Sequence, residues 1–373
     1  MKNLLILASV LGTISSTASL TAAEIKVGYL LPLSGSGAEY GQRQLKGANL
    51  AIDEYNKQKA GFTIKLVTSD TKCVPVEASN AAERLVERDG IQVMIGGSCS
   101  PEAIAALRVT QKAKVPHIVP AAAATSITEE GNPYVFRIVP NTKQIAENLA
   151  DVLADRIKVK QIVTVYLNDD FGIDLNTNLV NRIQAKGVKV LAQEGIERTT
   201  MDFFSTVAKI KPLNPDVVVA PLFNKPAAQL ARTMREQGMT APLSDTIMLT
   251  DEFHQLAGPA AFGTVQTTFF HPSVKSERGQ SFVERFKAKY GGELPGNFEA
   301  EGYDAVTLVI AALKRSGADK SFNKEAVTQA LRETKRFAGV MGPITFDQKG
   351  QVEAPAEKFV LIRNDQGKLV PMD

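Results

Sequence analysis

The sequence predicts an α/β protein of two similar lobes, each built on a parallel β-sheet that is flanked by helices. Three observations predict this fold class. Short β-branched runs alternate with amphipathic stretches from Ile25 onward, the same rhythm starts again at Gln161, and 373 residues suffice for two or three domains. Strands that alternate with helices form parallel sheets covered on both faces. No low-complexity linker separates the two sets, so we expect short crossing segments that act as a hinge.

The first set of elements follows this alternation in order. Strands are expected where β-branched or apolar residues run together, and helices where apolar residues recur at helical spacing. The expected strands are residues 25–31, 62–69, 91–95, 116–119 and 134–139. The expected helices are residues 42–57, 75–88 and 101–112.

The second set repeats the pattern over a comparable length of chain. Its expected strands are residues 161–167, 188–194 and 216–222, and its expected helices are residues 174–186, 202–211 and 226–237. The remaining chain completes the lobes, with helices at residues 280–290, 301–316 and 324–334 and closing strands at residues 342–346 and 359–363.

The first residues have the layout of a secretory signal peptide. Lys2 supplies a positive start, Leu4–Ile14 is an apolar run, and Thr21, Ala22 and Ala23 are small residues suited to a cleavage site. The alternative is a membrane anchor, but the run is short and interrupted by Ser and Thr. We therefore expect residues 1–23 to be removed and the mature protein to be exported and soluble.

Composition excludes several classes of partner. The formal charge of +3 comes from 43 basic and 40 acidic residues without a dense basic tract, which argues against nucleic acid. The chain has no Trp and only 6% aromatic residues, which argues against broad stacking platforms. Its three His residues are scattered. We expect no metal site and no cofactor.

Cys73 and Cys99 are the two cysteines of the chain. Export to an oxidising compartment favours a disulfide between them. Two separate buried thiols are the alternative. A catalytic cysteine is disfavoured because no His or acid lies in a recognisable partner motif.

The segment from Val93 to Glu102 carries the most informative local pattern. A buried strand runs into two glycines, and Ser100 and Pro101 then suit the first turn of a helix, with Ser100 as its N-cap. A helix start offers free N–H groups that can hold a carboxylate, at the strand end where ligands of open α/β sheets gather. The alternative is that Ser100 only caps its own helix.

Other strand ends offer further candidates for a pocket. After the strand at 116–119, Ala121 and Ala123 would let a ligand approach the backbone, with the Thr125 hydroxyl nearby. Tyr40, Phe171 and Phe223 occupy comparable strand ends and could form aromatic walls. Each of these residues has a packing role as its alternative.

A ligand ammonium group requires an acid, and Asp245 is the candidate because it follows a short apolar strand candidate. Asp169 and Asp170 are alternatives, although adjacent acids before a helix commonly cap it. No nucleophile–base pair, metal cluster or dinucleotide motif is recognisable, so we expect a binding protein rather than an enzyme. A secreted two-lobed hydrolase or transferase, or a sensory module, remains the alternative of another class.

Several of these features together resemble the periplasmic leucine/isoleucine/valine-binding proteins, the substrate-binding subunits of branched-chain amino acid ABC transporters. The similarity covers essentially the whole mature chain. It rests on the cysteine pair, the Gly-Gly-Ser-Cys-Ser and Pro-Ala-Ala-Ala turns, and the segment Met341–Asp347 followed by Gly350. The resemblance implies a type I periplasmic binding protein with a three-segment hinge. One lobe would comprise residues 24–141 and 272–347, and the other residues 142–271 and 348–373.

The resemblance also implies roles for individual residues. The ligand carboxylate would meet Ser100, and the backbone at Ala121 and Ala123 would face the ammonium and carboxylate groups. Asp245 would pair with the ammonium group. The pocket would be lined by Tyr40, Phe171, Phe223 and Phe298.

Two departures from the family pattern concern the pocket. Ala123 stands where the leucine binder has Thr, so one ammonium contact is either lost or taken over by Thr125. Phe171 and Phe223 stand where the leucine binder has tyrosines, which makes the wall more apolar. The implied function is delivery of a small amino acid, foremost a branched-chain one, to an inner-membrane ABC transporter permease by lobe closure. An aromatic carboxylate or an amide is the alternative solute, and we expect a monomer.

Overall fold

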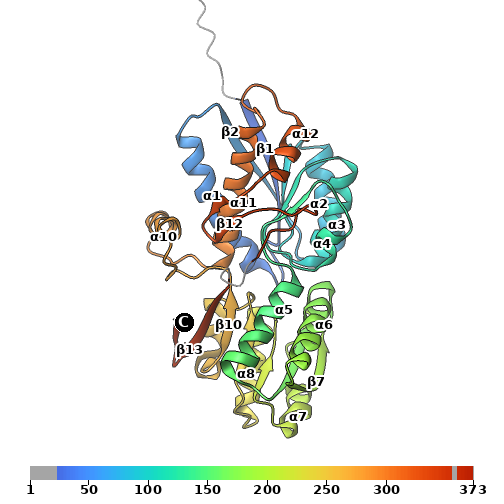
Figure 1. Ribbon diagram of the computed structural model, residues 1–373, viewed down its shortest axis with the longest axis vertical. Coiled ribbons are helices and arrows are strands. Elements are labelled where there is room, and N and C mark those ends of the chain that lie inside the picture. The colour runs from blue at the N-terminus through green and yellow to red at the C-terminus, as the bar shows by residue number, and fades with distance from the viewer. Residues whose placement is uncertain (1–22, 355–358, 373) are drawn as a thin grey trace, which may run out of the picture.

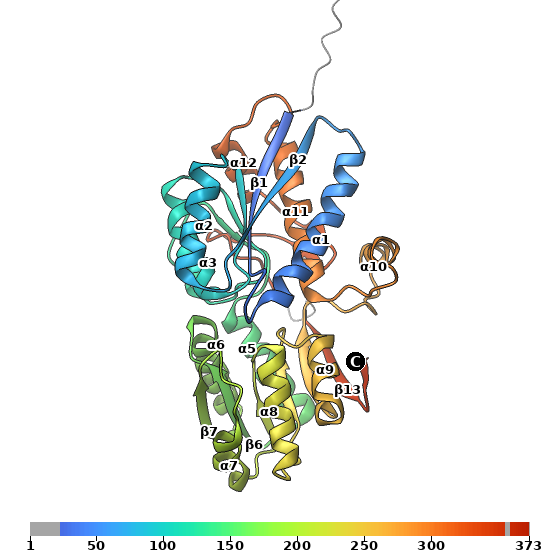
Figure 2. The same cartoon turned by 180° about the vertical axis from the view of Figure 1, so that it is seen from behind.

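The computed structural model describes residues 23–354 and 359–372, which form two lobes stacked along the long axis of the molecule (Figure 1). The expected signal peptide lies outside the described residues except for Ala23. Figure 2 shows the same two lobes from behind, with α1 in the upper lobe and α8 and α9 in the lower one.

The first lobe is built on a five-stranded, fully parallel sheet in the order β2-β1-β3-β4-β5. Its strands are β1 (Ala23–Leu31), β2 (Phe62–Asp70), β3 (Val93–Gly96), β4 (His117–Val119) and β5 (Val135–Arg137). Helices α1 (Ala38–Lys57) and α11 (Asn297–Arg315) pack together on one side of the sheet, and α2 (Pro75–Glu87) and α3 (Ser100–Lys112) on the other (Figure 1). Central strands buried on both faces explain the apolar runs in the sequence.

Smaller elements complete this lobe. They are α4 (Ser126–Glu129), α10 (Glu277–Lys289), α12 (Lys324–Arg332), β11 (Phe337–Gly339) and β12 (Gly342–Ile344). The expectation that the strand near residue 342 closes a lobe sheet is wrong, because β12 pairs with β11 in a separate antiparallel hairpin.

The second lobe has a seven-stranded sheet in the order β14-β13-β10-β9-β8-β6-β7. Pairing is parallel from β10 to β7, and β13 and β14 join antiparallel at the edge. The strands are β6 (Gln161–Leu167), β7 (Lys189–Ile196), β8 (Val217–Val219), β9 (Leu243–Thr246), β10 (Val265–Thr268), β13 (Val360–Asp365) and β14 (Lys368–Pro371).

Helices cover both faces of the second sheet. In Figure 1 α5 lies in front of the sheet, whereas α8 and α9 lie in front of it in Figure 2. The helices are α5 (Thr142–Asp151), which continues as a π-helical turn (Val152–Ile157), α6 (Asp170–Ala185), α7 (Phe204–Ile210), α8 (Asn224–Glu236) and α9 (Asp251–Ala257). Short 3₁₀ turns follow α7 at Lys211–Leu213 and α9 at Gly258–Ala261.

The chain passes between the lobes at residues 138–141, at residues 269–276 and again after Val352. Gln351 and Val352 bridge to Arg137 and Phe346, which belong to the first lobe. We therefore propose lobe boundaries at 141/142 and 271/272, with the third boundary after Val352 rather than at residue 347.

Candidate functional site

The turn between β3 and α3 depends on two glycines with positive φ. Gly96 has φ 149° and Gly97 has φ 87°. A Cβ atom on Gly96 would lie 2.7 Å from the backbone oxygen of Leu30, and one on Gly97 would lie 2.5 Å from the Cβ of Ala103. Only glycine therefore lets the chain turn this closely into the helix.

The start of α3 is capped by a carboxylate rather than by a hydroxyl. Glu102 accepts hydrogen bonds from the N–H groups of Ser98 (2.6 Å) and Cys99 (3.0 Å) and from the Thr71 hydroxyl. Burial raises the pKa of Glu102, although these hydrogen bonds oppose that rise. Cys99 is the N-cap, so the expectation that Ser100 caps this helix is wrong.

Ser100 instead joins the two backbone turns of the first lobe. Its hydroxyl accepts a hydrogen bond from the Ala124 N–H at 3.0 Å, and the Ala123 carbonyl accepts one from Thr142 N–H at 2.8 Å. The N–H groups of Ser100 and Ala123 have no hydrogen-bond partner among the described residues. Two donors at or near a helix start remain available to an anion.

These turns form one wall of a small cavity between the lobes, at the carboxyl ends of strands from both sheets. The cavity measures about 30 Å³, room for about two water molecules. The first lobe contributes Tyr40, Ser98, Cys99, Ser100, Pro101, Ala121, Ala122, Ala123, Phe298 and Glu301, and the second contributes Leu167, Asp169, Phe171, Arg198, Phe223, Ile247 and Met248.

An aromatic stack crosses from one lobe to the other beside this cavity. The Tyr40 ring lies between Phe298, with centroids 4.4 Å apart, and Phe223, with centroids 5.4 Å apart. The Tyr40 hydroxyl donates to the Met248 carbonyl at 3.0 Å and accepts from Asn224 N–H at 3.2 Å. Because Phe223, Met248 and Asn224 belong to the second lobe, this stack closes the cavity.

Two residues expected in the site are not among those that line the cavity. Thr125 sits at the hinge, where its N–H donates to Asp174 at 2.7 Å and its hydroxyl lies 3.0 Å from that of Thr142. Asp245 lies inside β9 rather than after a strand, and its Oδ2 accepts from Leu249 N–H at 2.9 Å. Complete burial raises the pKa of Asp245, and its Oδ1 has no hydrogen-bond partner within residues 23–354 and 359–372.

Of the two alternative acids, Asp169 caps a helix, and Asp170 is the first residue of that helix. Asp169 is the N-cap of α6 and accepts from the N–H groups of Phe171 (3.1 Å) and Gly172 (3.0 Å). This cap holds Phe171 against the cavity.

Three polar residues of the wall were missed by the sequence interpretation. Glu301 lies three positions after Phe298 on α11, so helical spacing places both on one face, a signal that the sequence carried. Ser98 lies in the recognised turn. Arg198 follows β7 in a loop without a local pattern, and it donates to Asp169 (2.6 Å) and to the Cys73 carbonyl of the opposite lobe (2.6 Å).

The disulfide between Cys73 and Cys99 is present, as the sequence predicts, with Cα atoms 5.6 Å apart. It ties the loop after β2 to the start of α3. Because Cys99 is the N-cap and Cys73 accepts from Arg198, the disulfide supports the cavity wall directly.

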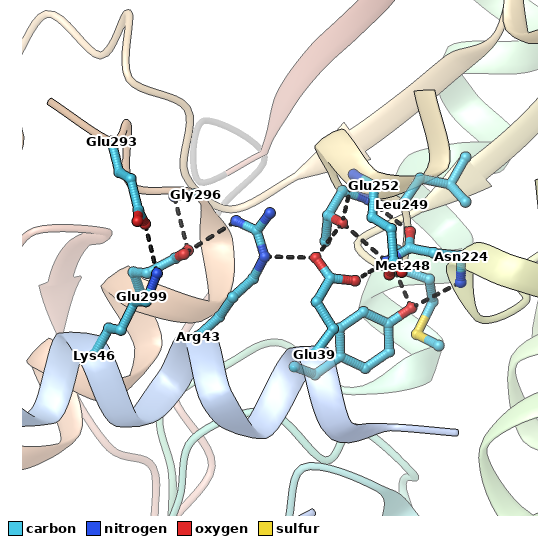
Figure 3. A network of polar contacts seen from close by, with 12 residues as sticks. Glu39, Arg43, Lys46, Asn224, Met248, Leu249, Glu252, Glu293, Gly296 and Glu299 are labelled. Carbon is cyan, nitrogen blue, oxygen red and sulfur yellow. Dashed lines mark hydrogen bonds and ion pairs between the residues drawn. The ribbon is translucent and has the colours of Figure 1, made fainter. Parts of the chain in front are cut away.

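A second polar seam joins the lobes outside the cavity (Figure 3). Glu39 on α1 accepts from the Thr250 hydroxyl at 2.6 Å and from the Asn224 amide, while Arg43 pairs with Glu39 (2.6 Å) and Glu299 (3.0 Å). A hydrogen bond to Glu39, followed by burial, raises the pKa of Glu252 to about 7. The same hydrogen bond and the charge of Arg43 lower the pKa of Glu39 despite its burial.

A larger hollow of about 310 Å³ lies on the other side of Phe298 and Ile247. Arg43, His271 and Leu294 are among its lining residues. It lacks the free N–H groups of Ser100 and Ala123, so the smaller cavity is the better candidate site.

A cavity between the carboxyl ends of parallel strands from two sheets, with donors free at a helix start, defines a two-lobed receptor for a small solute. The chain belongs to the periplasmic binding protein family, whose sequence model matches residues 24–365. The predicted fold class and family resemblance are confirmed, and the family is periplasmic. Every helix among the described residues is too short or too polar to cross a bilayer.

Similar proteins bind several kinds of solute. An amino acid binding protein of Pseudomonas aeruginosa is 29% identical over 97% of this chain and 96% of its own length. The branched-chain amino acid transporter substrate binding protein LivJ of Streptococcus pneumoniae, in complex with isoleucine, is 26% identical with a TM-score of 0.85, over 94% of this chain and 100% of that one. An ABC transporter solute binding protein of R. palustris, in complex with benzoate, is 27% identical with a TM-score of 0.86. The match covers 94% of this chain and 96% of that one.

Proposed function

We propose that this protein binds a small amino acid, foremost a branched-chain one, between its lobes and delivers it to an ABC transporter permease. The observation that carries the proposal is the pair of unpartnered N–H groups at Ser100 and Ala123, beside an aromatic wall. The donors suit an α-carboxylate, and Tyr40, Phe171, Phe223 and Phe298 suit an apolar side chain. Relatives named for amino acids support this solute class.

Binding in this proposal requires the lobes to open and close. A cavity of about 30 Å³ is too small for an amino acid, so Phe223 must withdraw from Tyr40 before the solute enters. Closure then buries the charged ends of the solute, where hydrogen bonds are stronger than in water. The hydrogen bonds that join Ala123 and Thr125 to the second lobe lie at the hinge, so they would adjust as the lobes move. The closed form would then dock on the permease.

An aromatic carboxylate is the second candidate solute. Benzenoid rings suit a wall of stacked aromatic side chains, and a 27% identical solute binding protein holds benzoate. The same N–H groups at Ser100 and Ala123 would hold its carboxylate. Such a solute would supply no cationic partner for Glu301, whereas Asp169 is already paired with Arg198.

A ligand panel tests the proposal. Thermal unfolding and calorimetry are performed on the full mature chain with leucine, isoleucine, valine, other amino acids, benzoate and small amides. We expect the branched-chain amino acids to raise the unfolding temperature most. If benzoates alone stabilise the protein, the amino acid assignment fails and the second candidate replaces it.

We also propose that the leader is cleaved near Ala23, that the mature protein is a monomer, and that it has no catalytic activity. N-terminal sequencing of exported protein tests the cleavage, and light scattering tests the oligomeric state. Prolonged incubation with each bound solute, followed by mass spectrometry, tests catalysis. Appearance of a product would support the hydrolase or transferase alternative.

A further inference from the structure

A chain of buried polar side chains ends at the first-lobe wall of the cavity. The Ser98 hydroxyl donates to Gln44 Oε1 at 2.7 Å, and Gln44 Nε2 donates to Glu301 Oε2 at 2.8 Å. Asn297 Nδ2 donates to Glu301 Oε1 at 2.7 Å. Gln44 is fully buried and Glu301 is 1% exposed, yet Ser98 and Glu301 both line the cavity.

Glu301 has no cationic partner among the described residues. The charge that acts on it most is the neighbouring Glu299, which, together with the dominant effect of burial, raises its pKa. The Tyr29 hydroxyl lies close enough to interact electrostatically with Glu301, and this fully buried oxygen has no hydrogen-bond partner in the described part of the chain. Each oxygen of Glu301 accepts one amide donor, but burying the carboxyl group without a cation among the described residues still carries a desolvation cost.

The other buried acids near the cavity have structural partners. Glu102 receives two backbone N–H groups and a hydroxyl, which complete the cap of α3. Asp245 receives Leu249 N–H at Oδ2 and does not line the cavity, although its Oδ1 has no partner among the described residues. Glu301 lies on the cavity wall, and its two oxygens can each accept a further hydrogen bond beyond the one from an amide donor.

We propose that Glu301 contacts the ligand, receives a hydrogen-bond donor of the solute, and so selects solutes with an ammonium, amide or hydroxyl group over purely apolar carboxylates. The inference rests on the proposed function, because it assigns Glu301 to the same cavity. The solute carboxylate occupies the N–H groups of Ser100 and Ala123, and its donor group lies against Glu301. An ammonium group there supplies the cation that the acid lacks.

Calorimetry with three probes tests this assignment: leucine, glutamine, and 4-methylpentanoate, which is leucine without its amino group. The variants are Glu301→Gln, Asp245→Asn, and the matched control Glu299→Gln, another buried acid of α11 that does not line this cavity. If the donor is the α-ammonium, E301Q lowers the affinities for leucine and glutamine at least tenfold and that for 4-methylpentanoate less than twofold. If it is a side-chain amide, only glutamine shows the selective loss.

The wild-type protein provides a readout that a purely structural role would not give. Binding of an ammonium group makes Glu301 release a proton, which appears as a dependence of the binding heat on the ionisation heat of the buffer. The Glu252 seam also exchanges a proton on closure, so the comparison is made in the Glu252→Gln background, where E301Q removes the dependence and E299Q keeps it. If E301Q does not fold, Glu301→Asp retracts the carboxyl group by one methylene and is expected to show the same selective loss.

Different results separate the two proposals. If the wild-type protein binds none of the three probes, the proposed function fails. If it binds them and the Glu301 variants weaken all three equally or not at all, only the present inference fails. A selective loss of amino-bearing probes in D245N but not in E301Q would likewise overturn it and assign the ammonium group to Asp245.

Discussion

The two faces of the cleft are built differently. On the first-lobe face, the side chains that shape the Ser100 turn are fixed within that lobe: Glu102 caps α3 and Ser100 holds the turn at Ala124. On the second-lobe face, the polar groups reach across: Arg198 donates to the Cys73 carbonyl and Asn224 to Tyr40 and Glu39. The first lobe is therefore organised for recognition before closure, whereas the second lobe holds the closed form.

Removal of the disulfide is expected to have the largest effect, and it acts on the first-lobe face. Cys73 and Cys99 are 26 positions apart, so the double variant Cys73→Ser/Cys99→Ser should lose about 3.5 kcal/mol of unfolding free energy. The ligand order should stay the same, because the N–H groups of Ser100 and Ala123 do not depend on sulfur. Denaturant unfolding and the ligand panel measure both. A changed ligand order would show that the first-lobe face is not organised independently of the disulfide.

Loss of the helix cap should have the next largest effect. Glu102→Gln replaces a carboxylate that accepts two backbone N–H groups, which should cost about 1–3 kcal/mol of stability and also weaken binding of any carboxylate solute. Glu77→Gln is the matched control, since Glu77 lies in the first turn of α2 and its side chain is 43% exposed. Urea unfolding and calorimetry measure the two effects. Equal stability of the two variants would mean that Glu102 does not organise this face.

The seam at Glu39 should make closure depend on pH. The pKa of Glu252 is about 7 in the closed form because Glu39 and Glu252 share a hydrogen bond across the lobes, and opening returns it to its ordinary value near 4.5. The closed form therefore binds one more proton between these values, so affinity should fall as pH rises from 5 to 8. Arg43, Asp251, Lys225 and Glu299 are the other charged groups around this pair.

The expected fall in affinity is about tenfold, after allowance for solvent screening of these half-buried groups. Calorimetry from pH 5 to pH 8 measures it, in parallel with the variant Glu252→Gln, which should remove most of the dependence. The same pH dependence in wild type and variant would exclude the seam as its origin.

Substitution of Arg198 should have the smallest effect, and it should change only the stability of the closed form. Arg198→Gln removes donors to Asp169 and to the opposite lobe, but the side chain is 21% exposed, so the loss should stay below about 1 kcal/mol. Stopped-flow dissociation should be about threefold faster, with unchanged ligand order. A change in ligand order would mean that this second-lobe residue also recognises the solute.

Features formed within one lobe could be predicted from sequence more readily than features that depend on contacts between the lobes. The alternation of strand and helix patterns predicted most strands of both sheets. The Gly96-Gly97 pattern predicted that the turn before Ser100 lines the site. Both signals lie within short stretches of sequence. Helix α5 was missed although Asn141 and Gln144 form a capping box at its start, a signal present in the sequence. Strand β9 was misjudged because its polar residues 244–246 are buried between parallel neighbours, which no local pattern shows.

The parts of the site that sequence did not predict depend on contacts between the lobes. Arg198 reaches the cavity from a loop, and its partner Cys73 is 125 positions away. Asp245 is an isolated acid whose role depends on the turn at Leu249. Thr125 faces the hinge because Asp174 of the other lobe accepts its N–H. Such pairings arise only when the two sheets are brought together.

A crystal structure of the protein with leucine tests the central claim most directly. We predict that the leucine carboxylate lies within hydrogen-bond distance of the N–H groups of Ser100 and Ala123, with the Tyr40 and Phe223 rings parted around the ligand. Leucine bound instead in the larger hollow beside Arg43 and His271, with the Ser100 turn unoccupied and the aromatic stack intact, would contradict the account.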